Sequence, residues 1–305
     1  MGSTGLAIAI VSAVLAGGFL AITGVLQQWA ASGRPPRESL SPRLLISLAR
    51  NRTWLLGLGS GVISYGFQAL ALAFGPLSLV QPVFASELLF AAPISVRLHQ
   101  TRMHAREWTG VICVPAGLAL GIVMAAPQRG NPLPALTSWG IAIGVVALGA
   151  GATVLAGRHL GGPVRASAYA FAGAAVMALQ SALLDATVAL ISRGAVPLFT
   201  SWQPYSLIPV TGLGVLLVES AYQAGPLVAS MPVMDAAEPS IAIALGVALF
   251  DEHVDTSPGH LAGTAAGLAL FLTGIILLDT SPVMHRLQRQ QETVVNAEAQ
   301  QSAPR

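Results

Sequence analysis

Long apolar stretches, separated by short segments that carry most of the charge, recur along the whole chain. A helix that crosses a bilayer needs roughly 20 predominantly apolar residues. The stretches that meet this requirement lie at about 5–27, 54–74, 77–97, 108–126, 139–157, 166–191, 203–224, 226–250 and 260–279. The pattern predicts an all-α fold, a polytopic membrane helical bundle of about nine spans.

The composition agrees with a chain embedded in a bilayer. Hydrophobic residues make up 54% of the 305 residues and charged residues only 9%, with a net charge of +2. A soluble domain carries about 25% charged residues, so this surface cannot face water throughout. The Arg residues form no basic stripe with interleaved aromatics, which excludes a nucleic-acid partner. The single cysteine, Cys113, gives neither a disulfide framework nor a Cys-based metal site.

Arginine positions predict the orientation in the membrane. Of the 15 basic residues, all but Arg129 and Arg193 fall after the first, third and fifth expected spans or in the C-terminal tail. Cytoplasmic connections are enriched in Lys and Arg. We therefore expect a multi-pass protein of the cell (inner) membrane, with the N-terminus outside and the C-terminus in the cytoplasm.

Two segments occur twice at the same separation. The nine residues Gly75–Val83 match 225–233 at five positions, 150 residues later, and Ala116–Leu120 recurs unchanged at 266–270. The copies lie five spans apart, and because five is odd the second copy crosses the membrane in the opposite direction. Inverted repeats are typical of secondary transporters, where the substrate binds between the repeats. We expect a first repeat of four spans at 1–127, an inverted second repeat of five spans at 128–281, and a disordered cytoplasmic tail at 282–305.

Acidic residues lie in the middle of two matching spans. Glu87 is central in the third span and Glu238 in the eighth, and Asp235 precedes Glu238 by about one helical turn. A charged group deep in a membrane is costly and is often functional. We expect these acids to face a central cavity and to bind a cation, a proton or a cationic substrate. The structural alternative is that they are neutral, hydrogen-bonded, and only hold the bundle together.

Other polar residues and prolines belong to the same expected site. Every Arg and His lies in a connection, in the tail or at a span end, so no base is expected opposite the acids, which favours a cation over an anion. Asp185 lies close enough to a span end to reach water. Paired segments interrupted by proline are a sequence signal for a transporter's site. The expected polar lining is Glu219, Gln68 and Gln81, and the expected helix breaks are Pro82, Pro93, Pro232 and Pro239.

Glycine spacing indicates close helix packing. Glycines four residues apart let helix backbones approach each other in lipid. They occur at Gly57/Gly61, Gly117/Gly121, Gly140/Gly144 and Gly263/Gly267. The same faces would allow a homodimer.

No motif indicates an enzyme or a resident cofactor. The chain lacks His-Glu-x-x-His, Gly-x-Ser-x-Gly and a Gly-rich phosphate loop followed by Lys. The acidic run at 251–255, which contains His253, is expected to be a solvated turn rather than a metal site.

Several short motifs resemble one membrane superfamily. They are Gly75–Val83, Glu107–Gly110 and Ala116–Leu118 in the first copy, and Pro232-Val233, Glu238-Pro239, Leu249–Glu252 and Ala266–Leu268 in the second. Over residues 5–279 the chain resembles the drug/metabolite transporter superfamily with EamA-type repeats, which implies a carrier that works by alternating access. The family's acidic residue at the end of the Pro-led helix is present as Glu252. The nine-span layout and the Gln/Arg-rich connection after the first span are similar to NIPA-type magnesium transporters.

Three functions stay open at this point. The first is a secondary transporter of a small solute, with Mg²⁺ as a candidate cation and Glu87 and Glu238 as its ligands, since hydrated Mg²⁺ needs only one or two carboxylates. The second is a proton-coupled exporter of amino acids, drugs or other metabolites, which an apolar pocket with aromatics beside Glu87 would favour. The third is a membrane scaffold subunit that transports nothing.

Overall fold

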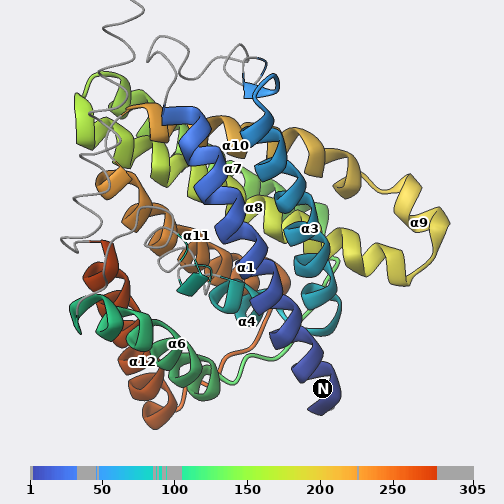
Figure 1. The fold of residues 1–305 in the computed structure, drawn as a ribbon. Helices are drawn as coiled ribbons and strands as arrows, with labels where there is room; N and C mark the ends of the chain where they lie inside the picture. Colours follow the sequence, from blue (N-terminus) through green and yellow to red (C-terminus); the bar gives the residue numbers. More distant parts are fainter. Residues whose placement is uncertain are drawn as a thin grey trace, which may run out of the picture.

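The computed structural model describes residues 3–32, 46, 48–84, 87, 89–90, 94, 105–224 and 227–279. These residues are helical apart from short connections and one isolated bridge between Gln128 and His253. Figure 1 shows the arrangement of the helices. They are α1 (Ser3–Ser32), α3 (Arg52–Phe74), α4 (Leu77–Phe84), α6 (Ala105–Ala125), α7 (Leu136–Arg158), α8 (Gly162–Ser192), α9 (Ala195–Thr200), α10 (Gln203–Ala224), α11 (Leu227–Phe250) and α12 (Pro258–Asp279).

The described helices confirm a helical membrane protein. Six of them, α1, α3, α6, α7, α8 and α10, include a segment long and apolar enough to cross a bilayer. Helices α11 and α12, with 24 and 22 residues, cover the eighth and ninth expected spans. The third expected span, 77–97, is a continuous described helix only over α4, and most residues beyond Phe84 lie outside the described part. The number of spans therefore stays a prediction.

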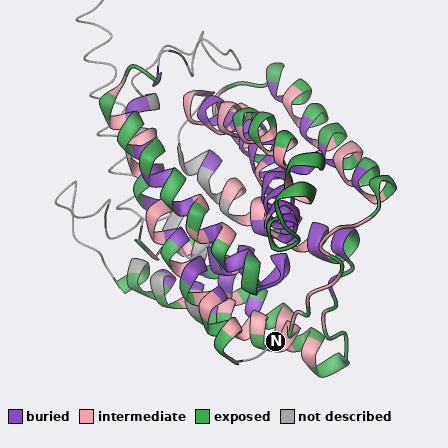
Figure 2. Ribbon diagram, turned by 90° about the vertical axis from the view of Figure 1, so that its right-hand side faces the viewer, coloured by how far each residue is buried: buried purple, intermediate pink, exposed green. Residues whose placement is uncertain are grey.

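Helix α8 forms the centre of the bundle. Within its membrane-length segment 83% of the residues are buried, against 19–33% in the other five. Purple, buried positions accordingly follow the central helix in Figure 2. Its inner positions are mostly alanines, which let α7, α10 and α11 pack closely around it. At Gly173, for example, an added Cβ would lie 3.0 Å from Val218 of α10.

Three pairs of antiparallel helices make the closest contacts: α1 with α3, α8 with α10, and α6 with α12. In the first pair, the hydroxyls of Ser60 and Ser64 donate to the carbonyls of Phe19 and Ala16, both at 2.8 Å. Gly57 faces the same partner, since an added Cβ would lie 3.0 Å from Gln27 of α1. The small residues of α3 therefore pack where the sequence predicted close approach.

The pair α6–α12 uses the glycines expected at its interface. A Cβ at Gly117 would lie 2.7 Å from the Gly267 carbonyl, and one at Gly267 would lie 2.8 Å from the Gly117 carbonyl. The expectation is wrong for Gly140 and Gly144 of α7, where no atom lies within 4 Å of an added Cβ. Among the described residues, that face of α7 therefore has no helix packed against these two glycines.

Candidate functional site

Glu87 and Glu238, one from each half of the chain, lie within range of each other's charge inside the bundle. Glu238 lies on α11, and Glu87 lies in a helical turn just beyond α4. Their charges are close enough to interact, and both act on the phenol of Tyr65 on α3. All three side chains are half-buried. Two acids and a phenol therefore share one environment built from three elements.

Buried amides lie on the helices that carry this group. Gln68 is one turn beyond Tyr65 on α3, and its Nε2 donates to the Ser181 hydroxyl of α8 at 3.1 Å. Gln68 is fully buried, and its Oε1 accepts no hydrogen bond. Gln81 of α4 is also buried, and its Nε2 donates none. Buried polar groups are normally paired, so these two atoms are exceptions. Gln68 has an unused hydrogen-bond acceptor and Gln81 an unused donor, and either could bind a polar ligand.

The prolines of α11 lie inside a continuous helix. This helix is continuous from Leu227 to Phe250 and passes through Pro232 and Pro239. A proline removes one backbone donor, and the remaining hydrogen bonds continue the helix. Pro82 likewise lies inside α4. Pro93 and the side chain of Asp235 lie outside the described part, so their expected roles stay predictions.

Glu219 belongs to a different place from the acid pair. It lies on α10, is 1% exposed, and its Oε1 accepts a hydrogen bond from Trp54 Nε1 of α3 at 3.1 Å. Its Oε2 has no partner, and neither does either amide atom of Gln223, one turn further along α10. The structure thus places Glu219 in a hydrogen bond that links α10 to the start of α3.

We expect Trp54→Phe to destabilise the protein by about 1–2 kcal/mol, because it leaves a buried carboxyl without its hydrogen-bond donor. Thermal unfolding in detergent measures the effect. Trp108→Phe is the matched control, since Trp108 is 55% exposed, and it should change stability little. The Trp54→Phe cost should shrink in a Glu219→Leu background. An equal cost in both backgrounds would contradict a role for the hydrogen bond.

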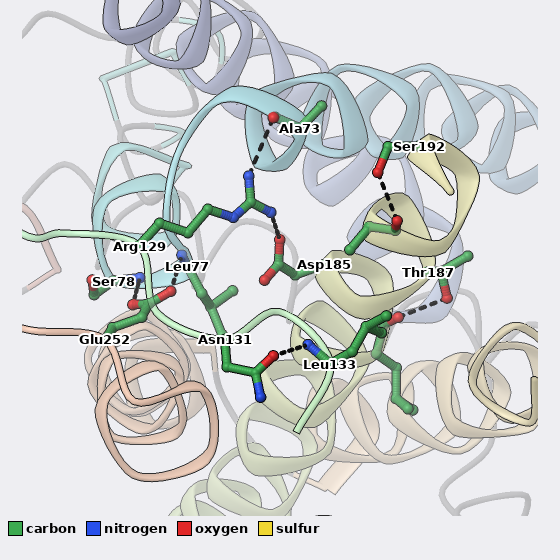
Figure 3. A network of polar contacts seen from close by, with 12 residues as sticks. Ala73, Leu77, Ser78, Arg129, Asn131, Leu133, Asp185, Thr187, Ser192 and Glu252 are labelled. Atoms are coloured by element: carbon green, nitrogen blue, oxygen red, sulfur yellow. Dashed lines mark hydrogen bonds and ion pairs between the residues drawn. The ribbon is translucent and has the colours of Figure 1, made fainter. Parts of the chain in front are cut away.

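Asp185 has a basic partner, contrary to expectation. The Arg129 guanidinium donates to Asp185 Oδ1 of α8 at 2.8 Å and to the Ala73 carbonyl, at the end of α3, at 3.2 Å (Figure 3). Arg129 does lie in a connection, but its long side chain reaches in from there. Asp185 is 1% exposed and does not reach water. The argument that the acids are uncompensated therefore fails for Asp185.

The run at 251–255 is not a fully solvated turn. Asp251 has a φ of 53°, the left-handed conformation common just after a helix. This turn brings the Glu252 N–H back to the Gly246 carbonyl at 3.1 Å and directs the Glu252 side chain inward. Glu252 is 4% exposed, whereas Asp251, His253 and Asp255 are exposed.

Glu252 caps α4. Its two carboxylate oxygens accept from the backbone N–H groups of Leu77 and Ser78 at 2.7 and 2.9 Å (Figure 3). The first N–H groups of a helix have no partner within the helix, and the positive end of the helix dipole favours an acid there. The resemblance to the superfamily singled out Glu252 as an acidic residue at a helix end, but it did not predict that Glu252 binds the start of α4.

The capping segment pairs with the connection between α6 and α7. Gln128 and His253 exchange backbone hydrogen bonds of 2.8 and 3.2 Å, and the Asn131 N–H donates to the Phe250 carbonyl at 2.6 Å. Beside them, the Ser257 N–H donates to Asp255 and holds the pKa of that carboxyl below its ordinary value. The connections 126–135 and 251–257 therefore form one paired structure at the end of the bundle.

A metal site is not evident among the described residues, where no three His, Cys, Asp or Glu side chains converge. Mg²⁺ is often held by only one or two carboxylates and keeps several waters. The pair Glu87 and Glu238 supplies that number of carboxylates, so Mg²⁺ as substrate stays a proposal.

Sequence reasoning missed Tyr65, Ser181, Trp54 and Arg129. The spacing of Tyr65 and Gln68 at three residues was available as a signal, since both lie on one helix face. Trp54 and Glu219 are 165 residues apart, and nothing local in the sequence links them.

Comparison with known proteins gives one distant relative. An uncharacterized protein of Corynebacterium glutamicum is 29% identical to this chain over 265 residues, which cover 82% of this chain and 88% of that protein. No family model and no solved structure matches the chain. The aligned region covers most of both chains, so the similarity is not confined to one segment.

Proposed function

We propose that the protein is a secondary transporter that moves a small cation or cationic solute by alternating access, with Glu87 and Glu238 at the binding site. The observation that carries this proposal is that these two acids lie within range of each other's charge and that both act on Tyr65. One acid comes from each half of the chain, so a relative movement of the halves would change the site. Transporters of several folds place their sites in this way.

Helix packing supports the accompanying proposal of two inverted repeats. Helices α6 and α12 are antiparallel, and their contacts occur in matching pairs. Gly263 faces Met124, and Gly274 faces Val114 and Cys113. The residue 150 positions before Gly263 is Cys113, and the residue 150 positions before Gly274 is Met124, so each contact has a counterpart in the other half. Likewise, the tight antiparallel pair α1–α3 in the first half has a counterpart in α8–α10 in the second. Together with the sequence duplication, this pattern favours membership of the drug/metabolite transporter superfamily.

The chemistry of the site favours a positively charged ligand. Two carboxyls in a membrane interior can hold a cation or a proton, and a hydrated Mg²⁺ fits because it keeps most of its waters. Proton-coupled export of a metabolite is the second candidate. Tyr65 favours it, because an aromatic ring with a hydroxyl can contact an organic cation, and the unused amide atoms of Gln68 and Gln81 can bind polar groups on such a solute.

The test is transport by purified protein in proteoliposomes that contain an Mg²⁺-sensitive dye or a pH-sensitive dye. The variants are Glu87→Gln and Glu238→Gln, and the control is Asp255→Asn in an exposed connection. We expect each Gln variant to reduce flux by at least about tenfold, as for the loss of a hydrogen bond to a charged group. The control should keep wild-type flux.

The two dyes separate the candidates. An Mg²⁺ signal lost in both Gln variants supports the cation transporter. A proton flux that depends on added amine or amino acid, and is lost in either variant, supports the exporter. If both Gln variants transport normally, the proposed site is wrong. If folded wild-type protein gives no signal with either dye, both transport candidates lose support and a scaffold role gains it.

A further inference from the structure

Hydrogen bonds join the two halves of the chain at the end of the bundle where α3 ends and α4 begins (Figure 3). Arg129 joins Asp185 of α8 to the last turn of α3 through the Ala73 carbonyl. Glu252, which follows α11, holds the first turn of α4. Helices α3 and α4 belong to the first half, and α8 and α11 to the second. This end is therefore fastened across the boundary at which the halves would move.

The chemistry of these contacts suits a reversible closure. Bonds between a guanidinium or a backbone N–H and a carboxylate are among the stronger hydrogen bonds in proteins. Asp185 and Glu252 are both buried, and their charges are close enough to repel each other. Each acid therefore depends on its own partner, Arg129 or the start of α4. Arg129 stays partly exposed, with 27% of its side chain accessible, so water can reach it when the contact opens.

We infer that Arg129, Asp185 and Glu252 form a gate that is closed in this structure. This inference rests on the proposed transport function. Opening toward this end requires Arg129 to leave Asp185 or Ala73, and Glu252 to leave Leu77 and Ser78. By the orientation predicted from the arginines, this end faces the outside.

Helix α4 connects the gate to the binding site. It has only eight residues, carries Gln81, and is followed closely by Glu87. Glu252 accepts hydrogen bonds from the first N–H groups of α4, so release of Glu252 would free the N-terminal end of α4. Glu87 follows the C-terminal end of the same helix. A cation that changes the position of Glu87 can thereby change the strength of the gate, and the opposite also holds because such coupling is reciprocal.

The experiment measures the width of this end directly. Spin labels are attached to Leu70→Cys on α3 and Val196→Cys on α9, both exposed positions, after the native cysteine is replaced by Cys113→Ala. Distances are measured by pulsed electron paramagnetic resonance in lipid nanodiscs. The test variants are the double substitution Arg129→Gln/Asp185→Asn, which leaves no lone buried charge, and Glu252→Gln. The control is Arg193→Gln, an exposed residue at the same end.

We expect the wild type and the control to give mainly the short distance. Each test variant should raise the ratio of long to short distances by about tenfold, the effect of one charged hydrogen bond. Unchanged distances in both test variants would overturn the gate, whatever the transport result. Longer distances together with no wild-type flux of Mg²⁺ or protons would support the gate and count against the proposed transport activity.

Discussion

Gly117→Leu is expected to abolish the stable folded protein. A side chain at this position would enter the backbone of α12, where the Gly267 carbonyl would lie 2.7 Å and Phe271 Cα 2.8 Å from the new Cβ. Backbone atoms cannot move aside as a flexible side chain can, so the two helices must separate. Overpacking of a core usually costs about 1–3 kcal/mol, and we expect at least the upper end of that range here. Size-exclusion chromatography of a fluorescent fusion in detergent measures the loss of monodisperse protein.

The matched substitution is Gly140→Leu on α7, where an added Cβ meets no atom within 4 Å. It makes the same chemical change in another apolar helix and should leave the elution profile as in the wild type. Gly267→Leu should behave like Gly117→Leu, because each glycine faces the backbone of the other helix. A monodisperse Gly117→Leu protein would show that α6 and α12 are not packed in this way.

Arg129→Ala should have the second-largest effect, a loss of about 3 kcal/mol of stability. Removing one member of a buried ion pair leaves the other charge without compensation, which costs about 3–5 kcal/mol. We expect the lower end of this range, because water reaches part of the Arg129 side chain and weakens the pair. The Asp185 side chain is only 2% exposed, so its lone charge would still be costly. In thermal unfolding we expect the apparent Tm to fall by roughly 5–10 °C.

The cause can be separated from simple loss of side-chain packing. Adding Asp185→Asn to Arg129→Ala removes the lone charge and should recover much of the lost stability. Arg193→Ala, which removes an exposed arginine at the same end, should shift Tm by at most about one degree. If Asp185→Asn deepens the loss in the Arg129→Ala background, the ion pair is not what stabilises this end.

The helices themselves could be predicted from the sequence. Long apolar runs leave the backbone of a membrane chain no alternative to internal hydrogen bonding, so runs such as 54–74 and 203–224 became α3 and α10 nearly to the residue. Glu87 and Glu238 also stand out in the sequence, because their neighbours are apolar, and their role in binding stays a prediction. What brings them to Tyr65 is the packing of α3, which no local pattern encodes.

The polar contacts at the bundle end could not be predicted in the same way. Arg129 was assigned to a connection, which is correct, but the reach of its side chain to Asp185 depends on how the helices pack. Glu252 was read with its exposed neighbours as solvated, although a single left-handed residue, Asp251, turns it toward α4. The spacing of Gly140 and Gly144 matched a packing signal on a face where no described residue lies within 4 Å of an added Cβ.

The contact between α6 and α12 also bears on how such a chain could have arisen. Met124 meets Gly263, and Cys113 meets Gly274, so each residue of one contact lies 150 positions from its counterpart in the other. Two identical molecules related by a two-fold axis make contacts of this reciprocal kind. If the two halves are inverted repeats, as proposed above, a half-length ancestor inserted in both orientations would already have possessed this interface. On that proposal, gene fusion would have fixed one copy in each orientation, and each half could afterwards acquire residues of its own, such as Arg129 and Glu252.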